Sequence, residues 1–232
     1  MKNKTILFGG SKGIGYEINK NFNFRGDEVL NFTRNQKETK TQLKFEIGKD
    51  KAVKLKKIIN FKFNYLIFSH RYRGLNTIDE YKIMVTEIEK IVMTLIPKFR
   101  NEASIVILGS NASKYILSEQ PGNYHYVRGA IETMVKYLAV KIGKYGIRVN
   151  SVLPCTILKR ENINYFKKEK KTINLIKKIT PLNRIGKSKD ISNIIEFLCS
   201  KKSSFITGQS FYVDGGSSLI GQESIAKLFN NK

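Results

Sequence analysis

The chain lacks several features by which secreted and membrane proteins are recognised. Its 232 residues include two cysteines, Cys155 and Cys199, so the sequence predicts no disulfide framework and fits a reducing cytoplasm. It contains no run of about 18 apolar residues, so no transmembrane helix is expected. The apolar part of the N-terminal segment is too short for a signal peptide. These absences indicate a cytoplasmic protein without a membrane partner.

Acidic residues are also scarce. The chain has 42 Lys and Arg residues but 19 Asp and Glu residues, so its net charge is +23. A nucleic acid or an anionic membrane is one interpretation of this charge, and lysines spread over solvated faces are another. An anionic substrate is a third, connected with the densest cluster at residues 167–171, Lys177 and Lys178. Because no basic motif is interleaved with aromatic residues, we expect no nucleic-acid partner.

Strand and helix patterns alternate along the chain, with 41% hydrophobic residues and no linker rich in Pro, Gly or Ser. This alternation predicts one α/β domain over residues 1–232: a Rossmann-type, doubly wound parallel sheet of about seven strands in three layers, α/β/α. The expected strands are rich in Val, Ile and Phe, as in sheets covered on both faces. They are 5–8, 28–32, 42–47, 65–68, 104–108, 147–153 and 210–213, and the clearest helices are 78–100, 124–144 and 189–199.

A glycine-rich turn follows the first expected strand. Gly9, Gly13 and Gly15 are spaced Gly-x-x-x-Gly-x-Gly, and such glycines let the backbone turn sharply and approach a pyrophosphate. The helix that follows offers free N–H groups and the positive end of its dipole to the same anion. We therefore expect a dinucleotide to bind at these glycines and at the residues between them, Ser11, Lys12 and Ile14.

The end of the second strand predicts which dinucleotide binds. An NAD site uses an acidic residue here to accept hydrogen bonds from the ribose 2′-hydroxyl, but the chain has Thr33 followed by Arg34. Arg34 and Lys12 are cations that suit a 2′-phosphate, although both are also ordinary surface cations in a Lys-rich chain. We expect the cofactor to be NADP(H).

The connection from the second strand to the third, residues 34–41, is short. A parallel crossover usually needs about a dozen residues or more, with a helix among them. We therefore predict that this crossover helix is missing. The adenine end of the cofactor should then be more exposed than in proteins that have the usual crossover helix.

The second half of the chain carries a further motif. Ser110 follows the expected fifth strand, and Tyr124 and Arg128 form Tyr-x-x-x-Arg in the next helix. With the glycine spacing and the segments 146–154, 181–186 and 213–216, this pattern resembles the short-chain dehydrogenase/reductase superfamily over essentially the whole chain. The resemblance implies an NADP-dependent oxidoreductase in which a Tyr donates a proton and a Ser binds the substrate carbonyl. A basic residue at the position of Lys12 marks NADP preference in that family.

The resemblance also implies further cofactor contacts and no metal. These contacts are Glu46 and Ile47 at the adenine, Ser69 and His70 after the fourth strand, Tyr124 and Arg128 at the nicotinamide ribose, and Pro154, Thr156 and Ile157 after the sixth strand. His70 stands at the carboxyl end of a central strand, where ligands bind. It either donates a proton or orients the cofactor, or it is a structural histidine.

The departures from the family pattern are concentrated at the residues that the resemblance assigns to catalysis and to cofactor binding. Arg128 replaces a Lys, and it keeps the positive charge but does not lose a proton. Met84 falls where the family has an Asn that holds a relay water, and residues 68–71 replace an Asn-Asn-Ala-Gly run. Lys159 replaces a Thr that usually holds the carboxamide, and Cys155 replaces a Gly. We expect catalysis that is slow but depends on the Tyr.

Two functions of different classes remain. The first is reduction of a carbonyl compound of the ketone, keto-sugar or oxoacyl type by NADPH, which the retained Ser110 and Tyr124 favour. The second is a non-catalytic nucleotide-binding or protein-interaction member of the same family, which the loss of the Lys and the Asn favours. The resemblance also implies self-association as a dimer or tetramer. An apolar stripe belongs either to that interface or to the core: Ile83, Ile88, Ile91, Val92 and Leu95.

Overall fold

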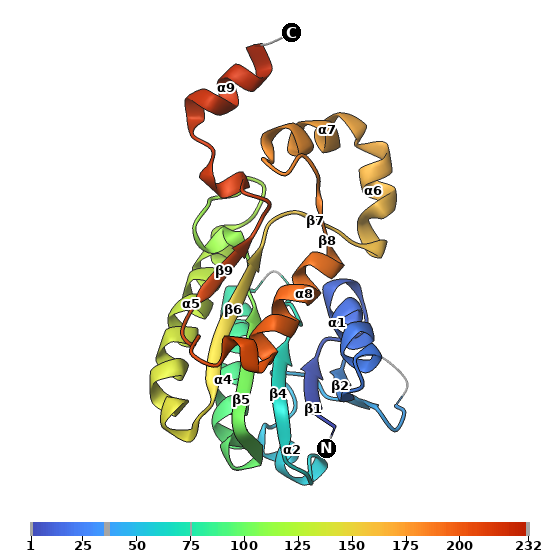
Figure 1. Cartoon of the computed structure of the whole chain (residues 1–232), viewed down its shortest axis with the longest axis vertical. Helices are drawn as coiled ribbons and strands as arrows, with labels where there is room; N and C mark the ends of the chain where they lie inside the picture. The colour runs from blue at the N-terminus through green and yellow to red at the C-terminus, as the bar shows by residue number, and fades with distance from the viewer. Residues whose placement is uncertain (1, 35–37, 75, 231–232) are drawn as a thin grey trace.

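A seven-stranded parallel sheet forms the centre of the molecule, as predicted (Figure 1). The computed structural model describes residues 2–34, 38–74 and 76–230. The strand order is β3-β2-β1-β4-β5-β6-β9, and each neighbouring pair is parallel. The strands are β1 (Lys4–Phe8), β2 (Glu28–Thr33), β3 (Gln42–Lys44), β4 (Phe63–Phe68), β5 (Phe99–Leu108), β6 (Arg148–Pro154) and β9 (Ser210–Val213).

Aromatic packing fixes the register of the three strands that carry the candidate site. Phe8 is paired in register with Phe32 of β2 and with Phe68 of β4. Its ring stacks on both neighbours, with 5.1 Å between centroids in each case. All three side chains are almost fully buried. Because these residues end their strands or come within one residue of doing so, their packing aligns the carboxyl ends of β1, β2 and β4.

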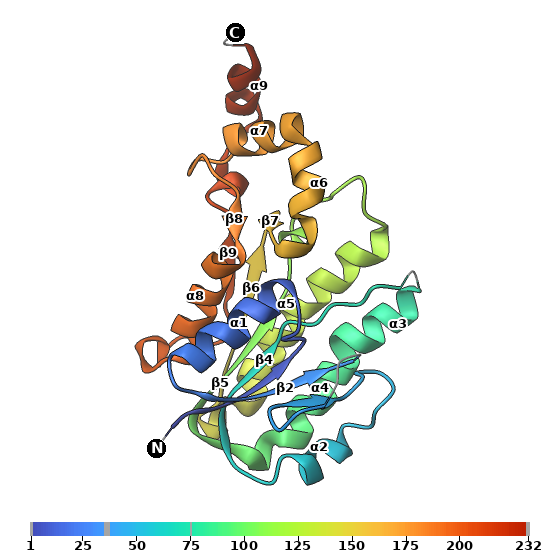
Figure 2. The ribbon, with the colours of Figure 1, turned by 90° about the vertical axis from the view of Figure 1, so that its right-hand side faces the viewer.

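Helices cover both faces of the sheet, which gives the predicted three layers (Figure 2). On one face α1 (Gly13–Phe24) and α8 (Ser188–Cys199) pack on side chains such as Leu7 and Ile67. On the other face α2 (Val53–Ile58), α4 (Glu87–Leu95) and α5 (Gly122–Ile142) pack on the residues that alternate with them, such as Phe8 and Leu66. This alternation explains why the strands are apolar throughout.

The expected helix 78–100 is wrong as a single element. The chain forms α3 (Thr77–Tyr81), a π-helical segment (Lys82–Thr86) and then α4, and it ends in a 3₁₀ turn (Ile96–Lys98) that contains Pro97. Proline removes a helix hydrogen bond, so β5 begins at Phe99, earlier than predicted. The apolar stripe faces the core rather than the surface, since Ile88, Ile91, Val92 and Leu95 are at most 1% exposed.

Other boundaries differ by a few residues. The expected strand 42–47 ends at Lys44, and the expected helix 124–144 begins two residues earlier, at Gly122. The connection predicted to lack a helix has none in its described part, Arg34 and residues 38–41. Residues 35–37, on which part of that prediction falls, lie outside the described residues.

A smaller set of elements lies beyond the carboxyl ends of the strands (Figure 1). It comprises α6 (Ile163–Lys168), α7 (Lys170–Ile179), the two-stranded pair β7 (Ile157–Leu158) and β8 (Gly186–Lys187), and α9 (Gln222–Asn230). We call α6 and α7 the lid. In the part of the chain that the structure describes, no helix is both long and apolar enough to cross a membrane.

Candidate active site

The residues expected to bind cofactor and substrate gather at the carboxyl ends of the central strands. The glycine turn follows β1, Ser69 and His70 follow β4, Ser110 follows β5, and Pro154 ends β6. In a doubly wound sheet these ends form the crevice where ligands bind. The topology therefore brings together residues that are far apart in the sequence.

Close packing at the glycine turn leaves no room for side chains. Gly9 has φ +89°, and a Cβ atom on it would lie 2.7 Å from the backbone N of His70. A Cβ on Gly15 would overlap the carbonyl oxygen of Gly9. The buried side chain of Asn31 fixes the turn from β2, because its Oδ1 accepts a hydrogen bond from the N–H of Gly10 at 2.9 Å. Asn31 was not expected, since nothing in its local sequence marks this contact.

The adenine end has features that fit a dinucleotide with an extra phosphate. Thr33 Oγ1 is buried and has no hydrogen-bond partner in the part of the chain that the structure describes. Such an orphaned oxygen fits a site that a ligand completes. Lys12 and Arg34 are exposed beside the turn and the end of β2. These positions suit a phosphate on the ribose.

The other expected cofactor residues divide into lining and structural groups. Ile47 is part of the hydrophobic core, and Glu46 forms an ion pair with Lys49 at 3.3 Å. Ser69 donates to the carbonyl of Phe8 at 2.9 Å, which ties the end of β4 to β1. Ile14, Pro154 and Ile157 are buried, whereas Ser11 is half-buried and Thr156 is exposed.

The reaction end places the expected Ser and Tyr together. The hydroxyl of Tyr124 donates to Ser110 Oγ at 3.4 Å. Ser110 Oγ also accepts from the N–H of Ala112 at 3.2 Å and thereby caps the 3₁₀ turn Asn111–Ser113. Ser110 is buried and Tyr124 is half-buried, so the protein holds the pair while Tyr124 stays partly accessible to solvent.

Arg128 has a partner that the sequence did not reveal. Its Nη2 lies 3.3 Å from Oε1 of Glu80 in α3, and the two side chains are 4% and 5% exposed. The other carboxylate oxygen of Glu80 accepts from Asn123 Nδ2 at 2.7 Å. The guanidinium of Arg128 lies 4.5 Å from the centroid of the Tyr124 ring. Arg128 is thus fixed against the Tyr by a buried carboxylate that offsets its charge.

His70 follows β4 and is half-buried as a residue, but both of its ring nitrogens are buried. Burial lowers the pKa of His70 to about 4, and Arg128 adds to this effect while the Ile83 backbone opposes it. Neither ring nitrogen has a hydrogen-bond partner among the described residues. The imidazole is therefore neutral near pH 7, which argues against His70 as the source of a proton for catalysis.

Two further cations, Lys159 and Arg71, interact electrostatically with Tyr124. Burial lowers the pKa of Lys159, and Arg71 lowers it further, whereas Tyr124 and Glu161 oppose the shift. Arg71 is exposed, yet desolvation of its guanidinium lowers its pKa, with Arg73 and Arg128 adding to the effect and Tyr124 opposing it. Repulsion among these cations is relieved when an anion binds between them.

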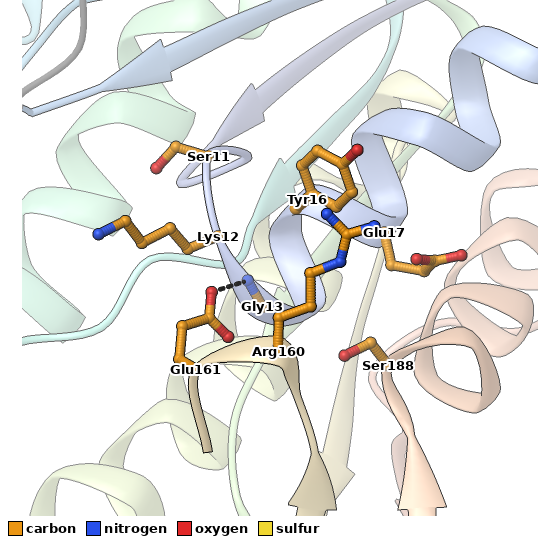
Figure 3. A pocket seen from close by; sticks show the side chains of 8 residues that line it. All are labelled: Ser11, Lys12, Gly13, Tyr16, Glu17, Arg160, Glu161 and Ser188. Carbon is orange, nitrogen blue, oxygen red and sulfur yellow. Dashed lines mark hydrogen bonds between the residues drawn. The ribbon is translucent and has the colours of Figure 1, made fainter. Parts of the chain in front are cut away.

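A cavity of about 170 Å³ lies at the start of α1. Its lining combines the glycine turn, the first turn of α1, Arg160, Glu161 and Ser188 (Figure 3). Oε1 of Glu161 accepts a hydrogen bond from the N–H of Gly13 at 2.7 Å. The guanidinium of Arg160 lies 5.0 Å from the centroid of the Tyr16 ring. Sequence analysis missed Glu161, because it comes from a segment 148 residues away from Gly13.

Two departures from the family pattern are structural in this protein. Met84 is 1% exposed and packs in the core, in the π-helical segment. Cys155 is half-buried near Asp214, and burial together with that carboxylate raises the pKa of its thiol. Cys155 therefore carries an uncharged thiol near pH 7, which does not favour reactivity.

Comparison with known proteins gives the family. The family model described as enoyl-(acyl carrier protein) reductase matches residues 81–218, more than half of the chain. A tropinone reductase homologue of Arabidopsis thaliana is 34% identical over 118 residues, which are 51% of this chain and 44% of that protein. The chain thus spans less than half of that relative's length. Senescence-associated protein 13 of Arabidopsis thaliana is 26% identical over 94% of this chain and 90% of its own.

The solved structures give the same result. A short-chain dehydrogenase family protein from Francisella tularensis superposes with a TM-score of 0.81 at 26% identity, over 95% of this chain and all of that one. The seven-stranded parallel sheet flanked by helices agrees with this match. The chain belongs to the short-chain dehydrogenase/reductase family of oxidoreductases, which use a nicotinamide cofactor.

Proposed function

We propose that this protein is an NADP(H)-dependent oxidoreductase that reduces a carbonyl compound to an alcohol. The observation that carries the proposal is the Tyr124–Ser110 pair, with 3.4 Å between the two hydroxyl oxygens, at the carboxyl end of the sheet. Hydroxyls in this arrangement form two hydrogen bonds to one carbonyl oxygen. They polarise it and hold it in place for reduction.

The proposed chemistry assigns one proton to this chain. A nicotinamide cofactor held at the glycine turn would supply the hydride that the carbonyl carbon receives. Tyr124 gives its hydroxyl proton to the carbonyl oxygen as the C–O double bond becomes a single bond, and Ser110 donates a hydrogen bond to the same oxygen. The tyrosinate that remains then takes a proton from solvent, since Tyr124 is only half-buried.

Arg128 has a narrower role than a lone Lys would have. Its charge is offset by Glu80, and its guanidinium lies against the ring of Tyr124, 4.5 Å from the ring centroid. We therefore assign Arg128 and Glu80 to positioning of the Tyr ring. Lys159 and Arg71 supply the positive potential that stabilises tyrosinate, because Tyr124 interacts electrostatically with both.

The same two cations favour an anionic substrate. Their pKa values are lowered by burial and by crowding, so the site gains free energy when a negative group approaches. We propose a substrate that carries a carboxylate or phosphate close to its carbonyl group. A 2-oxo acid and the neutral ketone of the same chain length are matched probes, and Arg71→Gln should reduce the preference for the acid.

The test of the proposed function is NADPH oxidation with a panel of 2-oxo acids, neutral ketones, keto-sugars, oxoacyl thioesters and quinones. Wild type should turn over at least one class, and Tyr124→Phe should lower turnover by about 10²–10⁴-fold, the usual contribution of a general acid. Arg128→Lys serves as the matched control, because it keeps the charge beside Glu80 and should react as fast as wild type or faster.

The outcomes separate the two candidate functions. Turnover that is unchanged in Tyr124→Phe would contradict the assignment of the acid. Tight NADPH binding without turnover in any variant would instead support the non-catalytic member of the family.

We also propose that residues 1–232 act as one domain and that the protein self-associates as a dimer or tetramer. The outer face of α5 supports an interface, since it leaves Tyr126 74%, Tyr137 49% and Val140 85% exposed. Apolar side chains gathered on one helix face are typical of association surfaces. Light scattering at physiological ionic strength should give a mass of two or four chains, and Val140→Asp should shift it toward one chain.

A further inference from the structure

The carboxylate of Glu161 stands where the glycine turn would bind a phosphate. Its Oε1 accepts from the N–H of Gly13 at 2.7 Å, and its Oε2 lies 3.5 Å from where a Cβ on Gly13 would be. Gly13 is the first residue of α1, so this N–H is one of those that an intrahelical partner cannot satisfy. Figure 3 shows Glu161 reaching the turn from the opposite side of the cavity.

The first turn of α1 has no anion of its own. The described residues of that turn include no acidic side chain, and Lys12 at the N-cap position forms no side-chain capping bond. A helix N-terminus favours negative charge through its free N–H groups and its dipole. Glu161 supplies that charge from elsewhere in the chain.

We propose that Glu161 is an affinity-determining residue of the cofactor site, which holds the pyrophosphate position in the free protein and is displaced when the dinucleotide binds. The proposal rests on the proposed function, because it assumes that a dinucleotide binds at this turn. It adds a residue that competes with the ligand rather than contacting it.

The size of the cavity supports displacement. About 170 Å³ is available beside Glu161, whereas pockets for small molecules are usually roughly 300–1,000 Å³. A dinucleotide therefore needs more space than this cavity offers, and displacement of the Glu161 carboxylate would supply part of it. Glu161 is exposed to solvent, so water can replace its hydrogen bond at little cost.

Lys159 gains a new partner in the exchange. Its Cδ lies 3.4 Å from where a Cβ on Gly13 would be, so its stem covers the same turn. Glu161 is the carboxylate that partly offsets the charge of Lys159 in the free protein. A pyrophosphate at the turn takes the place of the Glu161 carboxylate, so Lys159 still has an anion beside it.

Displacement also affects the lid. Glu161 belongs to the turn Arg160–Asn162, and α6 begins at the next residue. Asn162 makes this turn rigid, because it accepts from the N–H of Lys159 at 2.7 Å and donates to the carbonyl of Ile157 at 2.9 Å. Over residues 163–168 and 170–179, all of which are described, no lid residue is buried. The Glu161 contact is thus one of the attachments that the lid loses when the dinucleotide binds.

The experiment is calorimetric titration of NADPH into wild type, Glu161→Gln and Glu169→Gln. Glu169 is an exposed carboxylate between α6 and α7, so its variant removes the same charge without touching the glycine turn. Glu161→Gln should bind NADPH about tenfold more tightly than wild type, the scale of one charge-assisted hydrogen bond that no longer has to be broken. Glu169→Gln should bind as wild type does, apart from a small effect of net charge.

Limited digestion with trypsin, which cuts after Lys and Arg, gives a second measurement that is independent of activity. The lid contains Lys167, Lys168, Lys170 and Lys171, all exposed. NADPH should accelerate cleavage there in wild type, and Glu161→Gln should be cleaved rapidly with or without NADPH.

The results distinguish this inference from the proposed function. Equal or weaker NADPH affinity in Glu161→Gln would overturn the inference alone. An absence of NADPH binding in every variant would overturn the proposed function, and the inference with it.

Discussion

Two carboxylates of the candidate site hold groups that the chemistry needs, and they do so in opposite environments. Glu80 holds the guanidinium of Arg128 at 3.3 Å, with both side chains at most 5% exposed. Glu161 holds the N–H of Gly13 at 2.7 Å and is exposed to solvent. The Glu161 contact is the shorter of the two, but because it is exposed we expect it to be the easier one to break.

The difference follows from what replaces each contact when it is broken. Water takes over the hydrogen bonds of an exposed carboxylate, so little free energy is lost. A buried charge has no such alternative, and separating it from its partner costs several kcal/mol. The structure therefore favours a fixed contact at Glu80, and the proposed displacement of Glu161 requires an exchangeable one at the glycine turn.

The largest expected effect is a loss of stability when a substitution breaks the buried ion pair between Glu80 and Arg128. Glu80→Ala leaves Arg128 as an uncompensated buried charge and removes the acceptor of Asn123. The free energy of unfolding should fall by about 3–5 kcal/mol. Urea denaturation followed by circular dichroism measures this change.

The matched variant is Glu161→Ala, which removes the same side chain from the exposed contact. Its free energy of unfolding should change by less than about 1 kcal/mol, as for surface contacts in general. Equal losses in the two variants would contradict the comparison between a fixed and an exchangeable carboxylate.

The next prediction concerns how the free energy of unfolding depends on pH at the buried end of the site. The pKa of His70 falls from 6.5 to about 4 on folding, so the unfolded chain binds a proton in this range and the folded protein does not. The stability that the neutral imidazole provides is complete above pH 6.5 and is lost as the pH falls toward 4. The loss should amount to about 3 kcal/mol, at 1.36 kcal/mol per pKa unit.

His70→Leu removes the titrating imidazole and fills its place with a side chain that carries no charge at any pH. Its free energy of unfolding should vary less between pH 6.5 and pH 4 than that of wild type. Parallel pH profiles for the two proteins, measured by urea denaturation, would show that His70 does not carry the dependence.

The smallest effect concerns the exposed end, where single cations contribute modestly. Arg34→Ala should weaken NADPH binding by about 1–3 kcal/mol and leave NADH binding nearly unchanged, because only NADPH carries the 2′-phosphate. Lys20→Ala removes an exposed cation from α1 away from the turn and serves as the control. A loss of the same size for NADH would mean that Arg34 acts on the whole nucleotide.

The sequence predicted the sheet well because strands covered on both faces are apolar throughout. The seven expected strands are all present, and the boundary that was most wrong, residues 96–100, depends on how one proline ends a helix. The Ser110–Tyr124 pair was also predictable, since the motif fixes both residues relative to a strand and a helix.

The contacts that decide the behaviour of the site were not predictable in this way. Glu80 reaches Arg128 across 48 residues, and Glu161 reaches Gly13 across 148. Neither glutamate has a local signal that distinguishes it from the other acidic residues. The apolar stripe of α4 shows the same limit, because periodicity gives the apolar face but not what covers it.

The most direct test of the account is calorimetric titration of the wild-type protein with NADPH and with NADH. The central claim is that the glycine turn, Lys12 and Arg34 bind a dinucleotide that carries a 2′-phosphate. The account predicts that NADPH binds more tightly than NADH by about tenfold or more, as one charge-assisted hydrogen bond to the phosphate would give. Equal affinities, tighter NADH binding or no binding of either nucleotide would contradict it.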